Sequence, residues 1–214
     1  LVMMTPRVRP NALTQETDLP VVFIDSDLRE ETFDLYNIDN RGGAAHAVEH
    51  MIENGATRIA AITGPPGSYD VERRMAGYRQ ALERHGLDEG PVVEGDFTQK
   101  SGYEAGQAIL ASEHRPDAVF ACNDYMAMGA MLAFQEAGID IPGDIAVAGF
   151  DDITSARYAN PPLTSVRVPV YELGYQAGER LLKRIQSSRP PAPEAFKMDH
   201  ELKVRASTDR AAAA

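Results

Sequence analysis

Short carboxylate and amide side chains follow two neighbouring apolar runs in the middle of the chain. Asn123 and Asp124 follow Ala118–Ala121 after one intervening residue, and Asp151 follows the run Ile145–Ala148 closely. A short apolar run bounded by polar residues indicates a buried strand. In an open parallel sheet, ligands bind at the carboxyl ends of the strands. We therefore expect Asn123 and Asp151 to lie side by side at the mouth of a cleft.

Each of these side chains also has a purely structural interpretation. Asn123 can cap the helix that the following apolar spacing predicts, and Asp151 can make a turn. Asp152, beside Asp151, invites the interpretation of an acid–base pair. Consecutive carboxylates on an extended segment point to opposite sides, however, and no nucleophile is in view. We therefore predict that the chain is not an enzyme.

Two histidines raise the question of a metal site. His46, Glu49 and His50 fit the H-x-x-E-H pattern of one metallopeptidase class. Histidines four residues apart can share a zinc ion on one face of a helix. No third ligand is apparent, and the loop 64–67 lacks the lysine that a phosphate-binding loop needs. We therefore predict neither a metal nor a cofactor.

Apolar runs alternate with helix-period segments along the chain. Strands are expected at 1–5, 21–24, 35–38, 59–62, 92–93, 118–121 and 145–148, and extended segments near 165–168, 196–198 and 202–204. Helices are expected at 11–17, 44–52, 70–85, from a Ser101–Glu104 capping box to Leu110, after Asn123, and at 172–185 with Leu173, Ala177, Leu181 and Leu182 on one face. Residues 26–34 are polar and loop-like. This alternation predicts an α/β fold with a parallel, doubly wound sheet.

Composition narrows the class of protein. The chain has 214 residues, 43% of them hydrophobic, and a formal net charge of −11. That charge argues against direct binding to nucleic-acid phosphates. The single cysteine excludes an internal disulfide and is consistent with a reducing compartment. No apolar run approaches membrane-spanning length, and no signal peptide is visible.

An ordered set of motifs covers essentially the whole chain. It comprises PVVFID (20–25), RIAAITGP (58–65), RMAGY (74–78), GDFT (95–98), RPDAVFACND (115–124), IAVAGFDDI (145–153), PPLTSV (161–166) and ELKVRAST (201–208). Each motif alone is weak, but the order and spacing together are specific. The chain resembles the effector-binding region of the LacI/GalR family of bacterial transcription regulators.

The resemblance implies a two-lobed fold like that of periplasmic binding proteins. The implied N-terminal lobe is residues 1–38 plus 168–195, the C-terminal lobe is 39–167 plus 196–210, and 211–214 is a tail. The family's N-terminal helix-turn-helix and the first two βα units of its first lobe have no counterpart here, so the first lobe is expected to be incomplete. The strand at 1–5 would then be a sheet edge.

Six positions match, or lie near, the positions that bind the effector in this family. They are Asp25, Asp70, Arg74, Phe97, Asn123 and Asp151. Carboxylate, amide and guanidinium groups form paired hydrogen bonds with sugar hydroxyls, and an aromatic ring can cover the apolar side of a sugar. Structural alternatives stay open: a loop cap at Asp25, a helix cap at Asp70, a surface arginine at Arg74 and a core aromatic at Phe97.

The function implied by the resemblance is that of a sensor. The chain is expected to be the effector-binding and dimerisation module of a cytoplasmic, sugar-responsive repressor. It would bind a sugar or derivative between its lobes, form a homodimer, and control operator DNA through the missing N-terminal domain, with no membrane partner. The alternative is a stand-alone periplasmic sugar-binding protein of a transporter, which shares the architecture.

Overall fold

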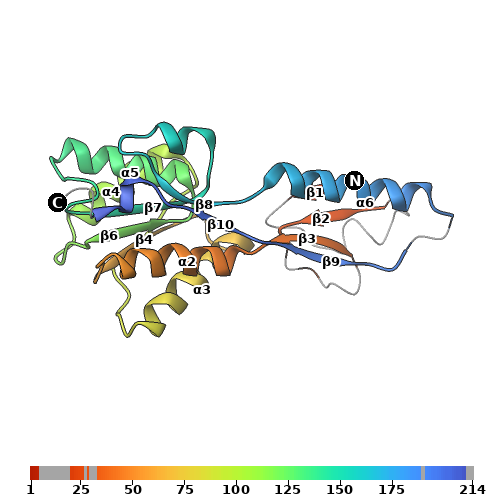
Figure 1. The fold of residues 1–214 in the computed structure, drawn as a ribbon, viewed down its shortest axis with the longest axis horizontal. Coiled ribbons are helices and arrows are strands. Elements are labelled where there is room, and N and C mark those ends of the chain that lie inside the picture. Colours follow the sequence, from red (N-terminus) through yellow and green to blue (C-terminus); the bar gives the residue numbers. More distant parts are fainter. Residues whose placement is uncertain (5–19, 27, 29–32, 189–190, 211–214) are drawn as a thin grey trace. The chain divides into compact units, whose positions relative to one another are not determined.

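The computed structural model describes residues 1–4, 20–26, 28, 33–188 and 191–210 (Figure 1). The chain divides into two compact units. The first contains Leu1–Asp39, Gly67–Asp70 and Val168–Asp199, and the second contains Asn40–Pro66, Val71–Arg167 and His200–Ala214. Among the described residues, no helix is long and apolar enough to cross a membrane.

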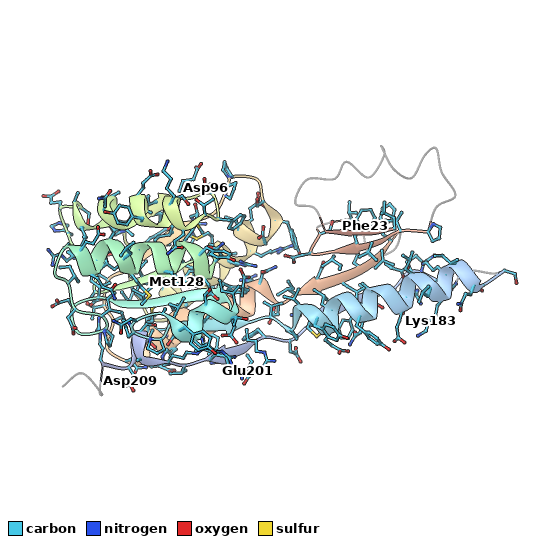
Figure 2. The ribbon with its side chains drawn as sticks, turned by 90° about the horizontal axis from the view of Figure 1, so that it is seen from above. Phe23, Asp96, Met128, Lys183, Glu201 and Asp209 are labelled. Atoms are coloured by element: carbon cyan, nitrogen blue, oxygen red, sulfur yellow. The ribbon has the colours of Figure 1, made fainter. Side chains whose placement is uncertain are left out.

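The first unit is built on a parallel sheet of four strands in the order β1-β2-β3-β9. These strands are β1 (Val2–Met4), β2 (Val22–Ile24), β3 (Asp34–Ile38) and β9 (Ala195–Met198). Helix α6 (Val170–Gln186) packs on β1 and β2. Phe23 on β2 is 1% exposed and meets the edge of the Phe33 ring (Figure 2). The sheet and one helix thus enclose a small apolar core.

The second unit contains a six-stranded sheet in the order β10-β8-β7-β6-β4-β5. Its strands are β4 (Ile59–Thr63), β5 (Val92–Glu94), β6 (Ala118–Ala121), β7 (Ala146–Asp151), β8 (Thr164–Arg167) and β10 (Glu201–Lys203). Every neighbouring pair is parallel except β8 and β10. The carboxyl ends of β4 to β8 therefore share one edge of the sheet.

Helices cover both faces of this sheet (Figure 1). They are α2 (Asn40–Glu53), α3 (Tyr69–Arg84), α4 (Gln99–Leu110) and α5 (Asp124–Glu136), with short 3-10 turns η1 (Thr154–Tyr158) and η2 (Ala206–Thr208). Helices α4 and α5 approach closely because glycines face each other. A Cβ atom at Gly102 would lie 2.2 Å from the Met126 carbonyl oxygen, and one at Gly129 would lie 2.1 Å from that of Gln99.

This architecture confirms the predicted α/β fold with parallel sheets and helices on both faces. Two local predictions were wrong. Helix α4 is capped by Thr98, whose side chain accepts a hydrogen bond from the Ser101 amide, and not by a Ser101–Glu104 box. The extended backbone of Thr98 places its hydroxyl over the first turn, so the helix begins two residues earlier. Leu182, predicted to share one helix face with Leu173 and Ala177, is 55% exposed because the side of α6 that meets the sheet carries Leu173, Ala177 and Arg180.

Four further predictions concern the chain ends and unit boundaries. The helix predicted at 11–17 and the tail at 211–214 lie outside the described residues. The strand predicted at 1–5 is observed as Val2–Met4, at one end of the four-strand order. The last boundary between units falls after Asp199 and not after residue 195, because β9 pairs with β3 of the first unit.

Candidate functional site

Arg74 lies at the centre of a polar cluster in the second unit. Its side chain comes from α3 and is only 5% exposed, so the surface interpretation was wrong. Its Nε donates to Asn40 Oδ1 at 2.8 Å, and its Nη1 donates to the Cys122 carbonyl oxygen. The guanidinium carbon lies 3.9 Å from the centroid of the Phe150 ring, within cation–π range. Contacts from α2, β7 and the end of β6 thus fix the guanidinium group.

Asp151 faces this arginine from the end of β7. Arg74 Nη2 and Asp151 Oδ1 are 3.4 Å apart, and the Asp151 side chain is 33% exposed. This separation exceeds the length of a strong charge-assisted hydrogen bond, about 2.7–2.9 Å. The pair therefore combines a buried cation with a carboxylate that still reaches solvent.

Asn123 follows β6, the strand next to β7, as predicted. Its Oδ1 accepts from the Met126 amide at 2.9 Å, which confirms the capping role. Its Nδ2 donates to the Phe97 carbonyl oxygen at 3.0 Å. The same amide thus caps α5 and ties the carboxyl end of β6 to the loop after β5.

Phe97 lies against the loop after β4. A Cβ atom at Gly64 would lie 2.4 Å from the Phe97 ring, so the ring packs directly on glycine backbone. Its φ is +69°, a conformation that costs a non-glycine residue about 1–2 kcal/mol. Asp151, with φ +104°, and Asp25, with φ +52°, also have positive φ. Backbone strain of this kind concentrates at ligand sites.

Four of the six predicted residues therefore converge at one edge of one sheet: Arg74, Phe97, Asn123 and Asp151. Asp25 and Asp70 belong to the first unit. Asp25 follows β2, where its amide donates to the Tyr36 carbonyl oxygen at 3.1 Å, and Asp70 is in the first turn of α3.

Sequence reasoning missed Asn40 as a member of the cluster. Asn40, the first residue of α2, is 1% exposed and accepts a hydrogen bond from Arg74 Nε. The signal available in the sequence was a polar residue at the start of a helix, on the same face as the apolar residues of that helix.

A second polar network lies beneath Asp151. Asp124, fully buried at the start of α5, accepts from Ser165 Oγ at 2.6 Å and from the Ile153 amide at 2.8 Å. Burial, with smaller contributions from the charges of Asp151 and Asp152, raises the pKa of Asp124 to about 7, against the lowering effect of these bonds. Asp152 pairs with Arg205. Asp151 and Asp152 thus have different partners.

The histidines of the H-x-x-E-H pattern have structural partners. His50 Nε2 is 2.9 Å from Thr208 Oγ1, and the His46 ring meets the edge of His200 at 5.5 Å. No group of three or more metal-ligating side chains is found within the described part of the chain.

An open hollow of about 610 Å³ lies at the opposite edge of the larger sheet. It is lined by the loops that precede β4, β5 and β6, including Arg58, Asp88 and His114. These loops stand at the amino ends of the strands, away from the Arg74 cluster. Because the buried polar groups and positive-φ residues lie at the carboxyl edge, we place the candidate site there.

A family model for the periplasmic binding protein-like domain matches residues 48–208. The HTH-type transcriptional repressor PurR of Histophilus somni is 36% identical over 92% of this chain and 60% of its own length. The ribose operon repressor of Escherichia coli is 40% identical over 78% of this chain and 51% of its own. The chain thus spans between half and 60% of the length of these relatives.

A sugar-binding transcriptional regulator of the LacI family from Escherichia coli, solved with phosphate, superimposes with a TM-score of 0.84. It is 30% identical, over 96% of this chain and 76% of that chain. The chain belongs to the LacI family. The transcriptional regulator CelR, solved in complex with cellobiose, gives a TM-score of 0.83 at 36% identity, over 88% of this chain and 58% of its own. Membership of the LacI family favours a regulator over the transporter alternative, and these relatives are named as regulators and not as enzymes.

Proposed function

We propose that this LacI-family chain is the effector-binding and dimerisation region of a cytoplasmic, repressor-type regulator. Its ligand is a small sugar or sugar derivative, bound by Arg74, Phe97, Asn123 and Asp151. The observation that carries this proposal is the Arg74–Asp151 pair: a nearly buried guanidinium group faces a carboxylate that remains one-third exposed.

The chemistry of these groups suits adjacent hydroxyls. Asp151 accepts hydrogen bonds, and Arg74 donates them in a fixed fork, so one hydroxyl can accept from the arginine and donate to the aspartate. Asn123 can accept through a second lone pair and donate through its second amide hydrogen. The Phe97 ring supplies an apolar surface for the C–H face of a sugar. Relatives solved with cellobiose and with ribose support this ligand class.

The two compact units correspond, in this proposal, to the two lobes of the family's fold. The ligand-binding roles of Asp25 and Asp70, in the first unit, stay predictions. The ligand shifts the conformational equilibrium only by the difference between its affinities for the two states. In the whole protein, an N-terminal DNA-binding domain reads that shift at the operator, and two copies of the chain form the dimer.

A thermal-shift screen against pentoses, hexoses and disaccharides, including ribose and cellobiose, tests the ligand assignment. A ligand at 100 times its Kd adds about 2.7 kcal/mol to the free energy of unfolding. We expect Asp151→Asn to remove this stabilisation. The matched control is Glu72→Gln, which removes an exposed carboxylate from α3. Equal sugar-dependent stabilisation of wild type and Asp151→Asn would rule out the site.

The regulatory part of the proposal needs the whole gene. The upstream coding sequence is expected to encode a helix-turn-helix. The affinity of the full-length protein for its operator DNA is expected to fall or rise when the sugar is added. A signal peptide in place of the helix-turn-helix would contradict the regulator and support the transporter alternative.

A further inference from the structure

Asp124 is a buried carboxylate that the proposed ligand contacts do not use. It is 0% exposed and begins α5, one residue after the capping Asn123. Burying a charged group is costly unless hydrogen bonds satisfy it. Asp124 is therefore expected to have a structural role at the candidate site, which its hydrogen bonds define.

Both Asp124 oxygens hold the segment that follows β7. Oδ2 accepts from the Ile153 amide at 2.8 Å, and Oδ1 accepts from Ser165 Oγ at 2.6 Å. Ser165 Oγ in turn accepts from the Asp152 amide at 3.0 Å. Two consecutive backbone amides after Asp151 are therefore tied to one buried side chain, the first through the serine and the second directly.

These bonds act on a strained stretch of backbone. Asp151 has φ +104° and Asp152 has φ +50°, and two consecutive non-glycine residues in this region cost about 1–2 kcal/mol each. Such a conformation persists only where surrounding contacts over-determine it. The Asp124–Ser165 network and the Arg205–Asp152 ion pair supply those contacts.

The strand itself makes room for the carboxylate. A Cβ atom at Gly149 would lie 2.3 Å from Asp124 Oδ1, closer than any Cβ contact tolerates. Position 149 must therefore be glycine as long as Asp124 keeps this position. Asp124, Ser165 and Gly149 thus form one arrangement from α5, β8 and β7.

We propose that Asp124 is a positioning residue, which holds the Asp151 carboxylate opposite Arg74 by locking the backbone immediately after it. This inference rests on the proposed function, because it assigns Asp124 to the same ligand site. Without Asp124, the turn at 151–153 relaxes, and the Asp151 side chain leaves the orientation in which it faces the guanidinium group.

The charged groups around Asp124 make this positioning sensitive to protonation. Asp151 and Asp152 raise its pKa from the β7 side, while Arg74 and Arg205 pair with those two carboxylates. A proton on Asp124 turns one acceptor oxygen into a donor and disturbs the bond to Ser165. Since burial raises the pKa of Asp124 to about 7, this exchange falls near neutral pH.

The test uses ligand-free protein, so that it does not depend on the proposed sugar. The Asp151 carboxyl and Arg74 Nε resonances are followed by NMR from pH 5 to 9, together with hydrogen exchange of the Ile153 amide. In wild type we expect both resonances to show a step near pH 7. In Asp124→Ala we expect no step, shifted resonances, and Ile153 exchange at least about tenfold faster, the effect of losing roughly 1.4 kcal/mol of protection.

Asp124→Asn serves as the conservative variant. Its amide oxygen can still accept from Ile153 while its NH₂ group donates to Ser165 Oγ. We therefore expect near-wild-type Ile153 exchange and no pH step. The matched control is Asp117→Asn at the opposite edge of the same sheet, where the Asp117 carboxylate also accepts from backbone amides, at Thr57 and Arg58. It is expected to leave the Asp151 and Arg74 signals unchanged.

Wild-type Asp151 and Arg74 signals in Asp124→Ala would overturn the proposal. If Asp124→Ala does not fold, Ser165→Ala, which removes one hydroxyl, is expected to shift the same signals, and an unchanged spectrum would overturn it equally. If the coupling is present but no sugar stabilises wild type, the positioning of Asp151 is supported and the proposed function fails.

Discussion

Two arginine–carboxylate clusters, one in each unit, differ in how deeply the carboxylate is buried and in how closely the arginine approaches it. In the first unit, Asp34 is 1% exposed and Arg180 is 8% exposed, with Arg180 Nη2 2.8 Å from Asp34 Oδ1. Arg184 also pairs with Asp34, and the Glu194 amide donates to it at 2.9 Å. In the second unit, Arg74 meets a one-third-exposed Asp151 at 3.4 Å.

The difference separates a structural ion cluster from a candidate ligand site. Burial raises the pKa of Asp34, but the bonds from Arg184, Arg180 and the Glu194 amide outweigh it, and the pKa is lowered. Asp34 thus joins β3, α6 and the residue before β9, and its charge is matched entirely within the protein. Asp151, by contrast, has a positive φ, lies 3.4 Å from Arg74 and has a side chain that is 33% exposed to solvent.

The largest expected loss of stability comes from removing the Asp34 carboxylate in the first unit. Asp34→Ala leaves two arginines without their buried carboxylate, and removing one partner of a buried ion pair costs about 3–5 kcal/mol. Chemical unfolding followed by hydrogen exchange in β3 measures the loss. Lys183→Ala, on the exposed side of α6, is the control and is expected to change stability by less than about 0.5 kcal/mol (Figure 2). Equal stability of the two variants would show that the Asp34 cluster contributes little.

Substitutions in the Arg74–Asp151 pair of the second unit are expected to lower stability less and to weaken sugar binding as well. Arg74→Ala leaves Asn40 and the Cys122 carbonyl without this donor, which costs about 1–3 kcal/mol. Asp151→Asn is expected to cost less than about 1 kcal/mol, because its carboxylate is part-exposed. Both are expected to lose sugar-dependent stabilisation in a thermal-shift assay. A stability loss for Asp151→Asn as large as that for Asp34→Ala would remove the distinction between the clusters.

The pH dependence of unfolding is expected to have opposite sign in the two units. The folded-state pKa of Asp34 is lowered, so its stabilisation is present above the unfolded value of 3.8 and is lost as pH falls through the folded pKa. The pKa of Asp124 is raised to about 7, so its contribution is full below 3.8 and is lost as pH rises to 7. Hydrogen exchange resolved by unit measures both slopes, and Asp124→Asn is expected to flatten only that of the second. A second-unit slope unchanged in Asp124→Asn would contradict the assignment.

The smallest effect compares two helix caps of the second unit. Thr98 caps α4, whereas Asn123 caps α5 and lies in the candidate site. Replacing either by alanine is expected to cost about 1 kcal/mol in unfolding free energy. Only Asn123→Ala is expected to weaken sugar binding as well, measured by calorimetry with the sugar that scores in the screen. An equal loss of sugar affinity in Thr98→Ala would show that losing either helix cap weakens binding, and would contradict a specific role for Asn123.

The fold was predictable because apolar runs and helix spacing are local signals. The placement of Asn123 and Asp151 at the ends of neighbouring strands followed from parallel strands sharing one edge. Asp34 was not predictable in the same way, since residues 26–34 are polar and resemble a loop, yet Asp34 begins a strand. Arg180 and Arg184 stand four residues apart on one side of α6, and only the tertiary fold shows which carboxylate they meet.

In the candidate site, too, the tertiary contacts could not be predicted from local sequence patterns. The resemblance supplied Arg74, but its burial depends on Asn40 and Phe150, which come from α2 and β7. Asp124 stood out in the sequence only as a polar residue after an apolar run, and nothing in the local sequence revealed that β8 and the turn after β7 would close over it. Contacts between segments far apart in the chain therefore decided what the local patterns left open.

The interleaving of the two units bears on how the protein is made. Strand β9 pairs with β3 across roughly 160 residues, and β10 pairs with β8 only after β9 has been synthesised. Neither unit can complete its sheet until the last tenth of the described chain has left the ribosome, since synthesis runs from the N-terminus. Until β9 and β10 emerge, β3 and β8 each have an unpaired edge, which is a template for pairing with other chains.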